Sequence, residues 1–258
     1  MVMNPICPET LAGQIAAQAY LRERLSPAHG DMFYVHLYDI LCFLKSLPLA
    51  DFESVLDYGC GGSPYRTLFN AKKYIRADYI NSDGIDIKIG LDAKLNCANE
   101  TFDAVLSTQV LEHAQDPQAY LNEAFRVLKP GGKLILTTHG IWEDHGCPYD
   151  FRRWTADGLK QEIADAGFCV AKTMKLTTGP RAILFMFGRM LGGLTYSRKT
   201  KFGWIFWLIR QSSLGRDKQR DAFLDKRYGH CVMVPDDMPG HGTYMAIGCI
   251  AEKSSDTR

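Results

Sequence analysis

A segment in the middle of the chain is dense in titratable side chains, and two of its histidines could act as a general base. Neutral imidazole gains a proton near neutral pH and can therefore take one from a hydroxyl or an amine during a reaction. His145 is the first candidate for this role and His139 is the second. The alternative interpretation is structural, in which Asp150 pairs with Arg152 or Arg153 and fixes the loop.

The same segment contains oxygen and nitrogen donors of the kind that bind transition metals. Their spacing matches no H-E-x-x-H or related ligand pattern, so the sequence predicts chemistry without a metal. The donors in question are His139, Glu143, Asp144, His145 and Asp150.

Earlier in the chain, an apolar run ends in Asp57 and breaks into glycines at Gly59 and Gly61. This pattern predicts a buried parallel strand and then a sharp turn, where residues without Cβ let backbone N–H groups approach a ligand. A predicted helix from Tyr65 to Ala71 would turn its positive N-terminal end toward the same ligand. The third glycine of a dinucleotide fingerprint is missing, because Pro64 takes its place, and no Gly-Lys-Ser/Thr ending follows. The turn therefore favours a nucleotide-like cofactor other than a dinucleotide.

An acidic residue at the end of the second predicted strand suits a ribose. Asp78 lies 21 residues after Asp57, near the offset of ~20 residues at which a carboxylate meets ribose hydroxyls in open α/β folds. A carboxylate there can accept hydrogen bonds from both hydroxyl groups. Asp83 and Asp86 are alternative candidates for the same role. The structural interpretation is that Asp78 is simply a solvated acid at the end of a strand.

Strands alternate with helices around these residues, which predicts an α/β fold. The predicted architecture is a doubly wound, mostly parallel, Rossmann-like sheet of seven strands. The strands are expected at residues 54–58, 74–79, 85–89, 101–107, 133–138, 169–176 and 244–251. Helices are expected at 9–25, 34–47, 65–71, 117–128 and 155–166, with a turn at 130–132. Asp116 is the predicted N-cap of the fourth helix, because Pro117 follows at the first helical position.

The predicted elements divide the chain into four parts. Residues 1–52 form an N-terminal helical cap that is expected to cover the sheet, with some lid function over the cofactor from its first helix. Residues 53–176 form the core that binds the cofactor. Residues 177–242 form an insertion with apolar helices at 182–191 and 202–209, because so long a connection does not fit a plain loop. Residues 243–258 supply the last strand and a tail.

Charge is concentrated in the insertion. Residues 181–227 contain eleven Lys and Arg against three Asp, a net charge of +8, while the rest of the chain carries −7. The first interpretation is a helical cap whose apolar face packs on the sheet and whose cations are solvated. The alternative is functional, because basic and aromatic residues together fit an anionic or lipid-linked acceptor, or peripheral contact with an acidic membrane surface. The overall net charge of +1 argues against a protein that coats nucleic acid.

Cysteine content and hydropathy bear on the compartment. The eight cysteines show no C-x-x-C spacing, which argues against a zinc ribbon or a redox pair. No signal peptide is recognisable, and no uncharged apolar run reaches the ~18 residues of a spanning helix. We therefore expect a cytoplasmic protein with reduced thiols.

Several motifs, in order, resemble class I S-adenosylmethionine (SAM)-dependent methyltransferases of the type 11 group. The D-x-G-x-G turn at 57–61 is similar to their first motif, with Ser63 at the usual place of its third glycine. The runs Phe102-Asp103-Ala104-Val105 and Val110-Leu111-Glu112-His113, followed by Asp116-Pro117, are similar to the family's F-D-x-V, V-L-E-H and D-P. The run 126–132 matches its R-V-L-K-P-G-G turn. The resemblance covers residues 53–140.

The resemblance implies that SAM is the cofactor and assigns residues to its amino-acid and ribose parts. Asp57, Gly59 and Gly61 would shape the pocket for the methionine portion. Asp78 would accept hydrogen bonds from the ribose hydroxyls, and Tyr79 would lie against the adenine.

The resemblance also assigns residues to the adenine and to the sulfonium. Asp92 would accept from the adenine amino group, with the backbone of Ala93 nearby. Thr108, Gln109 and Leu111 would border the sulfonium, just past the fourth strand.

The chain is therefore expected to transfer a methyl group from SAM to a small or lipid- or sugar-linked acceptor, most simply at oxygen. Methylation at nitrogen or carbon is the enzymatic alternative, and a non-catalytic SAM-fold subunit is the alternative of another class. A nucleic-acid substrate is disfavoured, because Ser107-Thr108-Gln109-Val110 stands where amino-group DNA methyltransferases carry D/N-P-P-Y/F. The sequence indicates neither the acceptor nor the oligomeric state.

Overall fold

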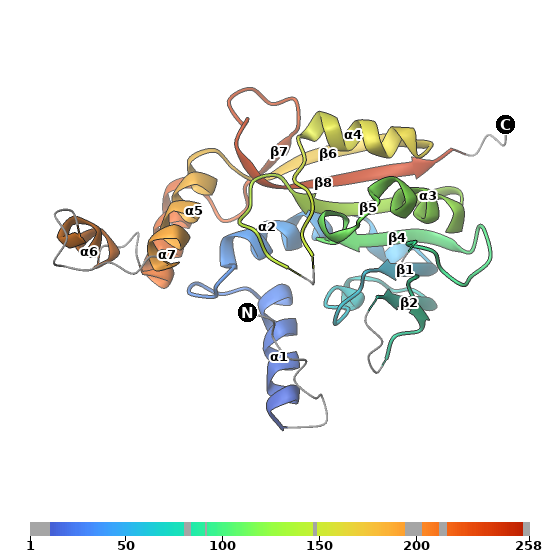
Figure 1. Ribbon diagram of the computed structural model, residues 1–258, viewed down its shortest axis with the longest axis horizontal. Coiled ribbons are helices and arrows are strands. Elements are labelled where there is room, and N and C mark those ends of the chain that lie inside the picture. Colours follow the sequence, from blue (N-terminus) through green and yellow to red (C-terminus); the bar gives the residue numbers. More distant parts are fainter. Residues whose placement is uncertain are drawn as a thin grey trace.

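One sheet organises the computed structural model, which describes residues 11–79, 84–90, 92–146, 149–193, 203–211 and 216–254. Its eight strands have the order β3-β2-β1-β4-β5-β8-β6-β7 (Figure 1). The strands are β1 (Ser54–Tyr58), β2 (Lys73–Asp78), β3 (Ile87–Lys88), β4 (Phe102–Thr108), β5 (Leu128–His139), β6 (Phe168–Thr178), β7 (Met233–Pro235) and β8 (Tyr244–Lys253).

Strand direction places the carboxyl ends of the sheet at one edge. Strands β3, β2, β1, β4 and β5 pair in parallel, and β8 is antiparallel to both β5 and β6. Strands β1 to β6 therefore point the same way. The predicted doubly wound, mostly parallel sheet is confirmed, with one more strand than expected, because the short β7 pairs with the edge of β6.

Helices cover both faces of the sheet. They are α1 (Leu11–Leu25), α2 (Tyr34–Lys45), α3 (Pro117–Val127), α4 (Ala156–Asp165), α5 (Gly179–Gly193), α6 (Gly203–Gln211) and α7 (Asp217–Tyr228). Leu134 and Leu136 of β5 pack with α3 and α4, whereas Ile135 between them packs with α2. This alternation is expected of a strand buried on both sides.

The local signals in the sequence have different outcomes. The predicted N-cap of α3 is confirmed, since the Asp116 carboxylate accepts a hydrogen bond from the amide of Ala119 at 3.0 Å. The predicted helix at 65–71 is wrong, because only one 3₁₀ turn forms, Arg66–Leu68. Phe69 is already extended, since the short connection must return to β2 and packs its apolar side chains on the core. No helix N-terminus therefore follows the glycine turn.

The insertion packs on α2 and β8 through a separate hydrophobic cluster. Phe185 of α5 and Leu224 of α7 pack against Tyr34 and Val35 of α2. Helix α7 was not predicted, because its sequence is polar and charged and its apolar residues are few. The predicted helix at 202–209 corresponds to α6, although its first residue lies outside the described residues.

Two cations counted in the basic surface are in fact internal. Arg181 is fully buried between Asp39 and Asp225, and Arg220 is fully buried beside Asp221. The pairing of Arg181 with Asp39 could not be predicted from the sequence, because the two residues are far apart in the chain. The exposed basic surface is therefore smaller than the composition of 181–227 indicates.

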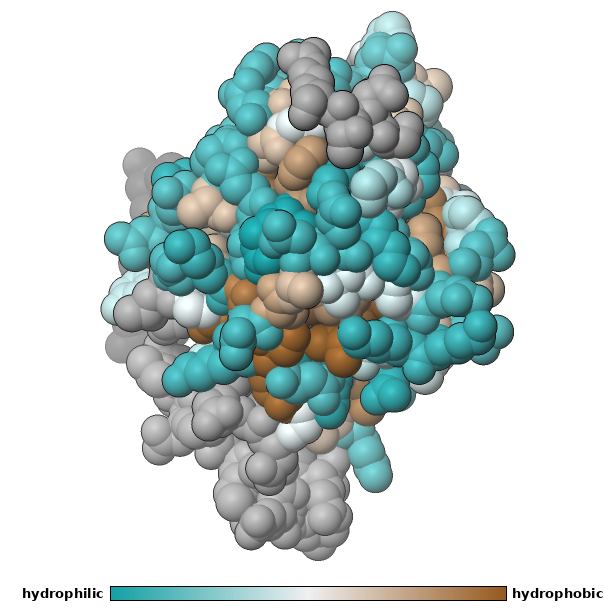
Figure 2. Space-filling view, turned by 90° about the vertical axis from the view of Figure 1, so that its right-hand side faces the viewer, coloured by the Kyte–Doolittle hydropathy of each residue, from teal (hydrophilic) through white to brown (hydrophobic). Residues whose placement is uncertain are grey.

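The opposite edge of the sheet, at the amino ends of the parallel strands, has a mostly polar surface. Figure 2 shows the face at the amino ends of the parallel strands, where hydrophilic residues dominate around a small hydrophobic group below the centre. Among the described residues, no helix has the length and apolar character that crossing a membrane requires.

Candidate active site

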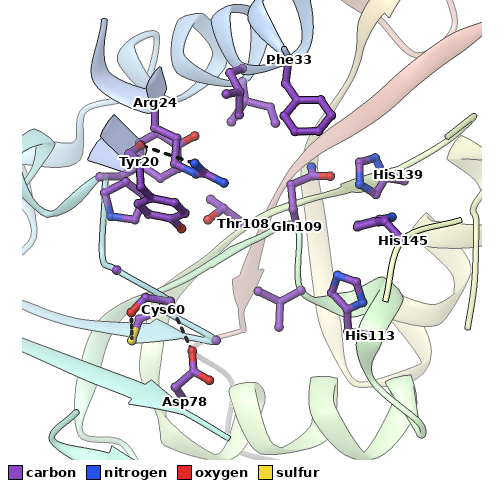
Figure 3. Close-up of a pocket in the computed structure, with 18 of the residues that line it drawn as sticks. Tyr20, Arg24, Phe33, Cys60, Asp78, Thr108, Gln109, His113, His139 and His145 are labelled. Carbon is purple, nitrogen blue, oxygen red and sulfur yellow. Dashed lines mark hydrogen bonds between the residues drawn. The ribbon is translucent and has the colours of Figure 1, made fainter. Parts of the chain in front are cut away.

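A cavity of about 590 Å³ lies at the carboxyl ends of β1, β2, β4 and β5. Figure 3 shows Asp78 and Cys60 at one end, three histidines at the other, and Thr108 and Gln109 between them. Two thirds of the predicted site residues lie on its wall: Gly59, Gly61, Asp78, Tyr79, Thr108, Gln109, His139 and His145. Four do not: Asp57, Asp92, Ala93 and Leu111.

The glycine turn after β1 forms the floor near β2. Gly59 has φ of +79°, and a Cβ there would lie 2.4 Å from Cγ1 of Val110. The amide of Gly59 donates to the carbonyl oxygen of Ala77 at 2.9 Å, and the amide of Gly61 donates to Oδ2 of Asp78 at 2.8 Å. The turn is therefore fixed to the end of β2, and no side chain fits at Gly59.

Asp57 and Leu111 lie behind the wall. Asp57 is buried and accepts a hydrogen bond from the hydroxyl of Tyr74 at 2.8 Å. Burial raises the pKa of Asp57 to about 6. Leu111 is fully buried, and its neighbour Val110 reaches the cavity instead. These two residues support the wall from behind.

The segment after β3 forms a tight turn, closed between Gly90 and Lys94. The amide of Gly90 donates to the carbonyl oxygen of Lys94 at 2.9 Å, and Ala93 adopts φ of +64°. The Asp92 carboxylate is largely exposed and lies 3.5 Å from Nζ of Lys94. The carbonyl oxygen of Ala93 accepts a hydrogen bond from the Tyr58 hydroxyl. This tight turn leaves Asp92 and Ala93 off the cavity wall.

His139 is held inside a stack of rings. It lies parallel to Trp142 with ring centroids 4.9 Å apart, and its ring is 5.1 Å from that of His36. Its Nε2 is 3.3 Å from Oε1 of Glu112. Burial lowers the pKa of His139 far below the ordinary value and that of His36 to about 3. Both imidazoles are therefore neutral near pH 7 and are poor proton acceptors.

His145 has the surroundings of a base. Its Nδ1 is 3.2 Å from Oδ2 of Asp150, whose carboxylate also accepts two hydrogen bonds of 2.6 Å from Arg153. Burial raises the pKa of Asp150, but the Arg153 contact outweighs this and lowers it to about 2. A permanently charged carboxylate at Nδ1 favours the tautomer with its proton there, which leaves Nε2 able to accept one. The predicted loop ion pair and the predicted base thus share one carboxylate.

Glu112 is fully buried at the base of the histidine cluster. Its Oε2 accepts a hydrogen bond from Thr138 at 2.8 Å. Burial raises the pKa of Glu112 to about 7. The carboxyl group is therefore partly protonated near neutral pH.

The raised pKa of Glu112 predicts that the stability of the fold depends on pH. The pKa of Glu112 rises from 4.5 to about 7 on folding, so unfolding releases a proton between these values and the free energy of unfolding falls as pH rises through them. Glu112→Gln is expected to flatten that fall, as measured by urea unfolding at pH 4.5, 6 and 7.5. The slope will not vanish, because burial also raises the pKa of Asp57 and of Asp39. An unchanged slope would contradict a protonated Glu112.

The possible metal ligands that the structure brings together differ from the five that were considered from the sequence. Ligand atoms of Glu112, His113 and His145 lie within 4.8 Å of one another. Glu143 and Asp150 are engaged elsewhere, by Arg189 and Arg153. The His113 ring also contacts the carbonyl oxygen of Tyr149 at 2.6 Å through Nδ1.

The N-terminal cap contributes cavity residues that were not predicted from the sequence. Tyr20 and Arg24 of α1 line the cavity, and the Arg24 guanidinium lies 3.5 Å from the Tyr20 ring centroid. In the part of the chain that the structure describes, no carboxylate forms an ion pair with Arg24. Phe33 and Trp142 close the opposite wall. The i, i+4 spacing of Tyr20 and Arg24 could have placed these two side chains on one face of a helix. No local signal in the sequence directs that face toward the glycine turn.

The sheet order, the glycine turn and the acidic end of β2 define a Rossmann-like enzyme that binds a nucleotide-type cofactor at its carboxyl edge. A family model described as a methyltransferase domain matches residues 29–172. The chain belongs to this family and is a class I SAM-dependent methyltransferase.

Curated relatives agree with this assignment, and a solved structure shares the fold. The ubiquinone biosynthesis O-methyltransferase of Parvibaculum lavamentivorans is 30% identical over 200 residues, 63% of this chain and 72% of that protein. The enzyme of the same name from Dinoroseobacter shibae is 32% identical over 142 residues and is matched over only 53% of its length. The [4+2]-cyclase SpnF has the same fold, with a TM-score of 0.53, 17% identity and coverage of 95% of this chain and 96% of its own.

Proposed function

We propose that SAM lies between the glycine turn and the end of β2, in the orientation that the family resemblance implies. The fit rests on the missing Cβ at Gly59, the Asp78 carboxylate on the cavity wall and the cation of Arg24. Gly59, Gly61 and Arg24 would hold the amino-acid portion, and Asp78 the ribose. When bound, SAM supplies a methyl group on a sulfonium that is already a good leaving group. The protein then has to orient the acceptor and remove its proton.

The role of Asp78 can be measured directly. Asp78→Asn replaces an acceptor of two hydroxyl hydrogen bonds by an amide, and hydrogen bonds to charged groups contribute about 1.5–3 kcal/mol. We expect SAM affinity to fall about 10- to 100-fold by calorimetry. Asp92→Asn serves as the matched control and should change affinity less, because its carboxylate lies off the wall. Equal losses in both variants would contradict this arrangement.

We propose further that the acceptor atom is a hydroxyl oxygen on a small, largely apolar molecule. The observation that carries this proposal is His145 on the cavity wall, with the Asp150 carboxylate behind it at Nδ1 and apolar residues elsewhere on the same wall. Phe33, Ile40 and Trp142 line this part of the cavity. A hydroxyl needs a base to become a good nucleophile, and the His145–Asp150 pair supplies one. The names of the O-methyltransferase relatives support the same acceptor atom.

A set of matched acceptors tests the proposal. An alkyl-substituted catechol, the corresponding aniline and the corresponding thiophenol differ only in the attacking atom. The catechol is expected to give a methyl ether and stoichiometric S-adenosylhomocysteine, measured by mass spectrometry. Methylation of the aniline in preference to the catechol would establish the N-methyl alternative instead.

We also propose that the acceptor is lipid-linked and that the insertion contacts an acidic membrane surface. Helix α6 stands away from the sheet (Figure 1), and Trp204 and Leu208 lie four residues apart on it, both about half exposed. Lys226 and Arg227 at the end of α7 are exposed as well. Exposed tryptophan beside cations suits a headgroup boundary.

Vesicle binding provides the test. The protein is expected to sediment with vesicles that contain phosphatidylglycerol and to remain in solution with pure phosphatidylcholine. Lys226→Gln with Arg227→Gln should weaken binding roughly 30-fold, since each cation near an anionic surface contributes about 1 kcal/mol. Trp204→Ala should weaken it too, whereas Met238→Ala, an exposed apolar residue outside the three helices, should not. Binding that ignores both salt and these substitutions would end the membrane proposal.

A further inference from the structure

A second group of ligating side chains lies outside the cavity, around Asp225 of α7. Oδ2 of Asp225 is 2.7 Å from Nε2 of His29, 2.8 Å from Nδ1 of His230 and 2.6 Å from the hydroxyl of Tyr34. The Asp225 side chain is almost fully buried, and the three neighbours come from the segment before α2, from α2 itself and from the turn after α7. None of them lines the cavity.

Oδ2 of Asp225 has more close neighbours than it has lone pairs to accept hydrogen bonds. A carboxylate offers about four lone-pair sites over its two oxygens, which leaves about two for each. Oδ1 already accepts from Arg181 at 3.0 Å, so Tyr34, His29 and His230 all converge on Oδ2. A cation between the two imidazoles and Oδ2 removes this excess, because the ring nitrogens then point lone pairs at the ion and Tyr34 keeps its donated hydrogen bond.

The ligands are held in place by groups behind them. Nη2 of Arg181 donates both to Oδ1 of Asp225 and to the carbonyl oxygen of His230, each at 3.0 Å. On the other side, the amide of Gly30 donates to Asp221 at 2.9 Å and so fixes the residue next to His29. Outer contacts of this kind orient the ligands of metal sites and keep them at the right spacing.

We propose that His29, Asp225 and His230 form a binding site for one divalent transition-metal ion such as Zn²⁺. Two imidazoles with one carboxylate select such ions over Mg²⁺ or Ca²⁺. Donors about 2.1 Å from a tetrahedral ion lie about 3.4 Å apart, so the hydrogen-bond distances of 2.7 and 2.8 Å found here would each lengthen when the ion enters. His230 is largely exposed, so ions enter from solvent and water completes the coordination. The ion ties the segment before α2 to the insertion.

The test must separate this site from the donors in the cavity. His145→Gln removes one ligand of the Glu112–His113–His145 set, and this variant, stripped with a chelator, is titrated with Zn²⁺ by calorimetry. One ion is expected to bind. His145→Gln combined with His230→Gln should bind it at least tenfold more weakly, and Zn²⁺ should raise the melting temperature of the first protein more than that of the second.

Two outcomes would overturn the proposal. The first is that the His145→Gln protein binds no Zn²⁺, which would mean that the group is a hydrogen-bonded cluster. The second is that adding His230→Gln changes neither affinity nor the thermal shift, which would place the ion elsewhere. Because the His230 side chain is largely exposed, its substitution should leave the fold intact, and unchanged SAM affinity would verify this.

Discussion

Replacement of His145 with alanine is expected to lower kcat for a phenolic acceptor by about 10²- to 10⁴-fold, the range for loss of a general base. SAM affinity should remain nearly unchanged, because the glycine turn and Asp78 lie at the other end of the cavity (Figure 3). Asp150→Asn should lower kcat less, since it alters the tautomer and orientation of the imidazole without removing it. Steady-state kinetics and calorimetry with SAM measure the two quantities separately.

A pH series distinguishes a lost base from a damaged loop. A phenol ionises without help near pH 10, so the rate of His145→Ala should recover toward that of the parent protein as pH approaches this value. A variant whose loop has collapsed would not recover. His241→Ala, which removes a histidine that contacts Thr178 outside the cavity, serves as the matched control and should keep its activity. Loss of SAM binding in His145→Ala would show a structural role instead.

Local chemistry explains which parts of the site the sequence could predict. The glycine turn and Asp78 are set by residues within one strand–turn–strand unit, and the turn fixes their relation through the Gly61–Asp78 hydrogen bond. The α3 cap is equally local, since Asp116 and Pro117 are adjacent. Such features depend on residue types that favour a particular backbone conformation and on short spacing between them. Both can be read directly from the sequence.

Long-range packing explains what the sequence could not predict. Tyr20 and Arg24 reach the cavity only because α1 lies across the turn, and Phe33 meets Trp142 across more than a hundred residues of chain, with ring centroids 5.8 Å apart. The predicted helix at 65–71 failed for a similar reason, because the connection from β1 to β2 is governed by what it packs on rather than by its helical propensity.

The contacts of arginine residues in the insertion could not be predicted from the sequence either. Arg189 of α5 is counted as a surface cation from the sequence, yet it donates to Glu143 and to the carbonyl oxygen of Met32 and lies 4.6 Å from the Phe33 ring centroid. It therefore joins the insertion to both loops that bear the aromatic wall of the cavity. The insertion therefore helps to hold this wall of the cavity in place.

Replacement of Arg181 with methionine is expected to lower the free energy of unfolding by about 3–5 kcal/mol, the usual cost of breaking a buried ion pair by removing one partner. Arg181 is fully buried and donates to Asp39 at 2.5 Å and to Asp225 at 3.0 Å, and both carboxylates are buried too. Methionine conserves volume but leaves two acids without their cation. Burial already raises the pKa of Asp39 to about 6 against the opposing effect of Arg181, so the variant should be less destabilised in mild acid, where Asp39 is protonated.

Urea unfolding at pH 5 and pH 7.5 measures both the loss and its pH dependence. Lys129→Met breaks the partly exposed pair with Asp103 and is the matched control, with an expected loss of at most about 1 kcal/mol. Adding Asp39→Asn to Arg181→Met should recover part of the stability, because one of the two unpaired charges disappears. If Arg181→Met cost no more than the surface control at either pH, the carboxylates would have to be neutral or hydrated, and the buried network around α7 would not hold the insertion to the core.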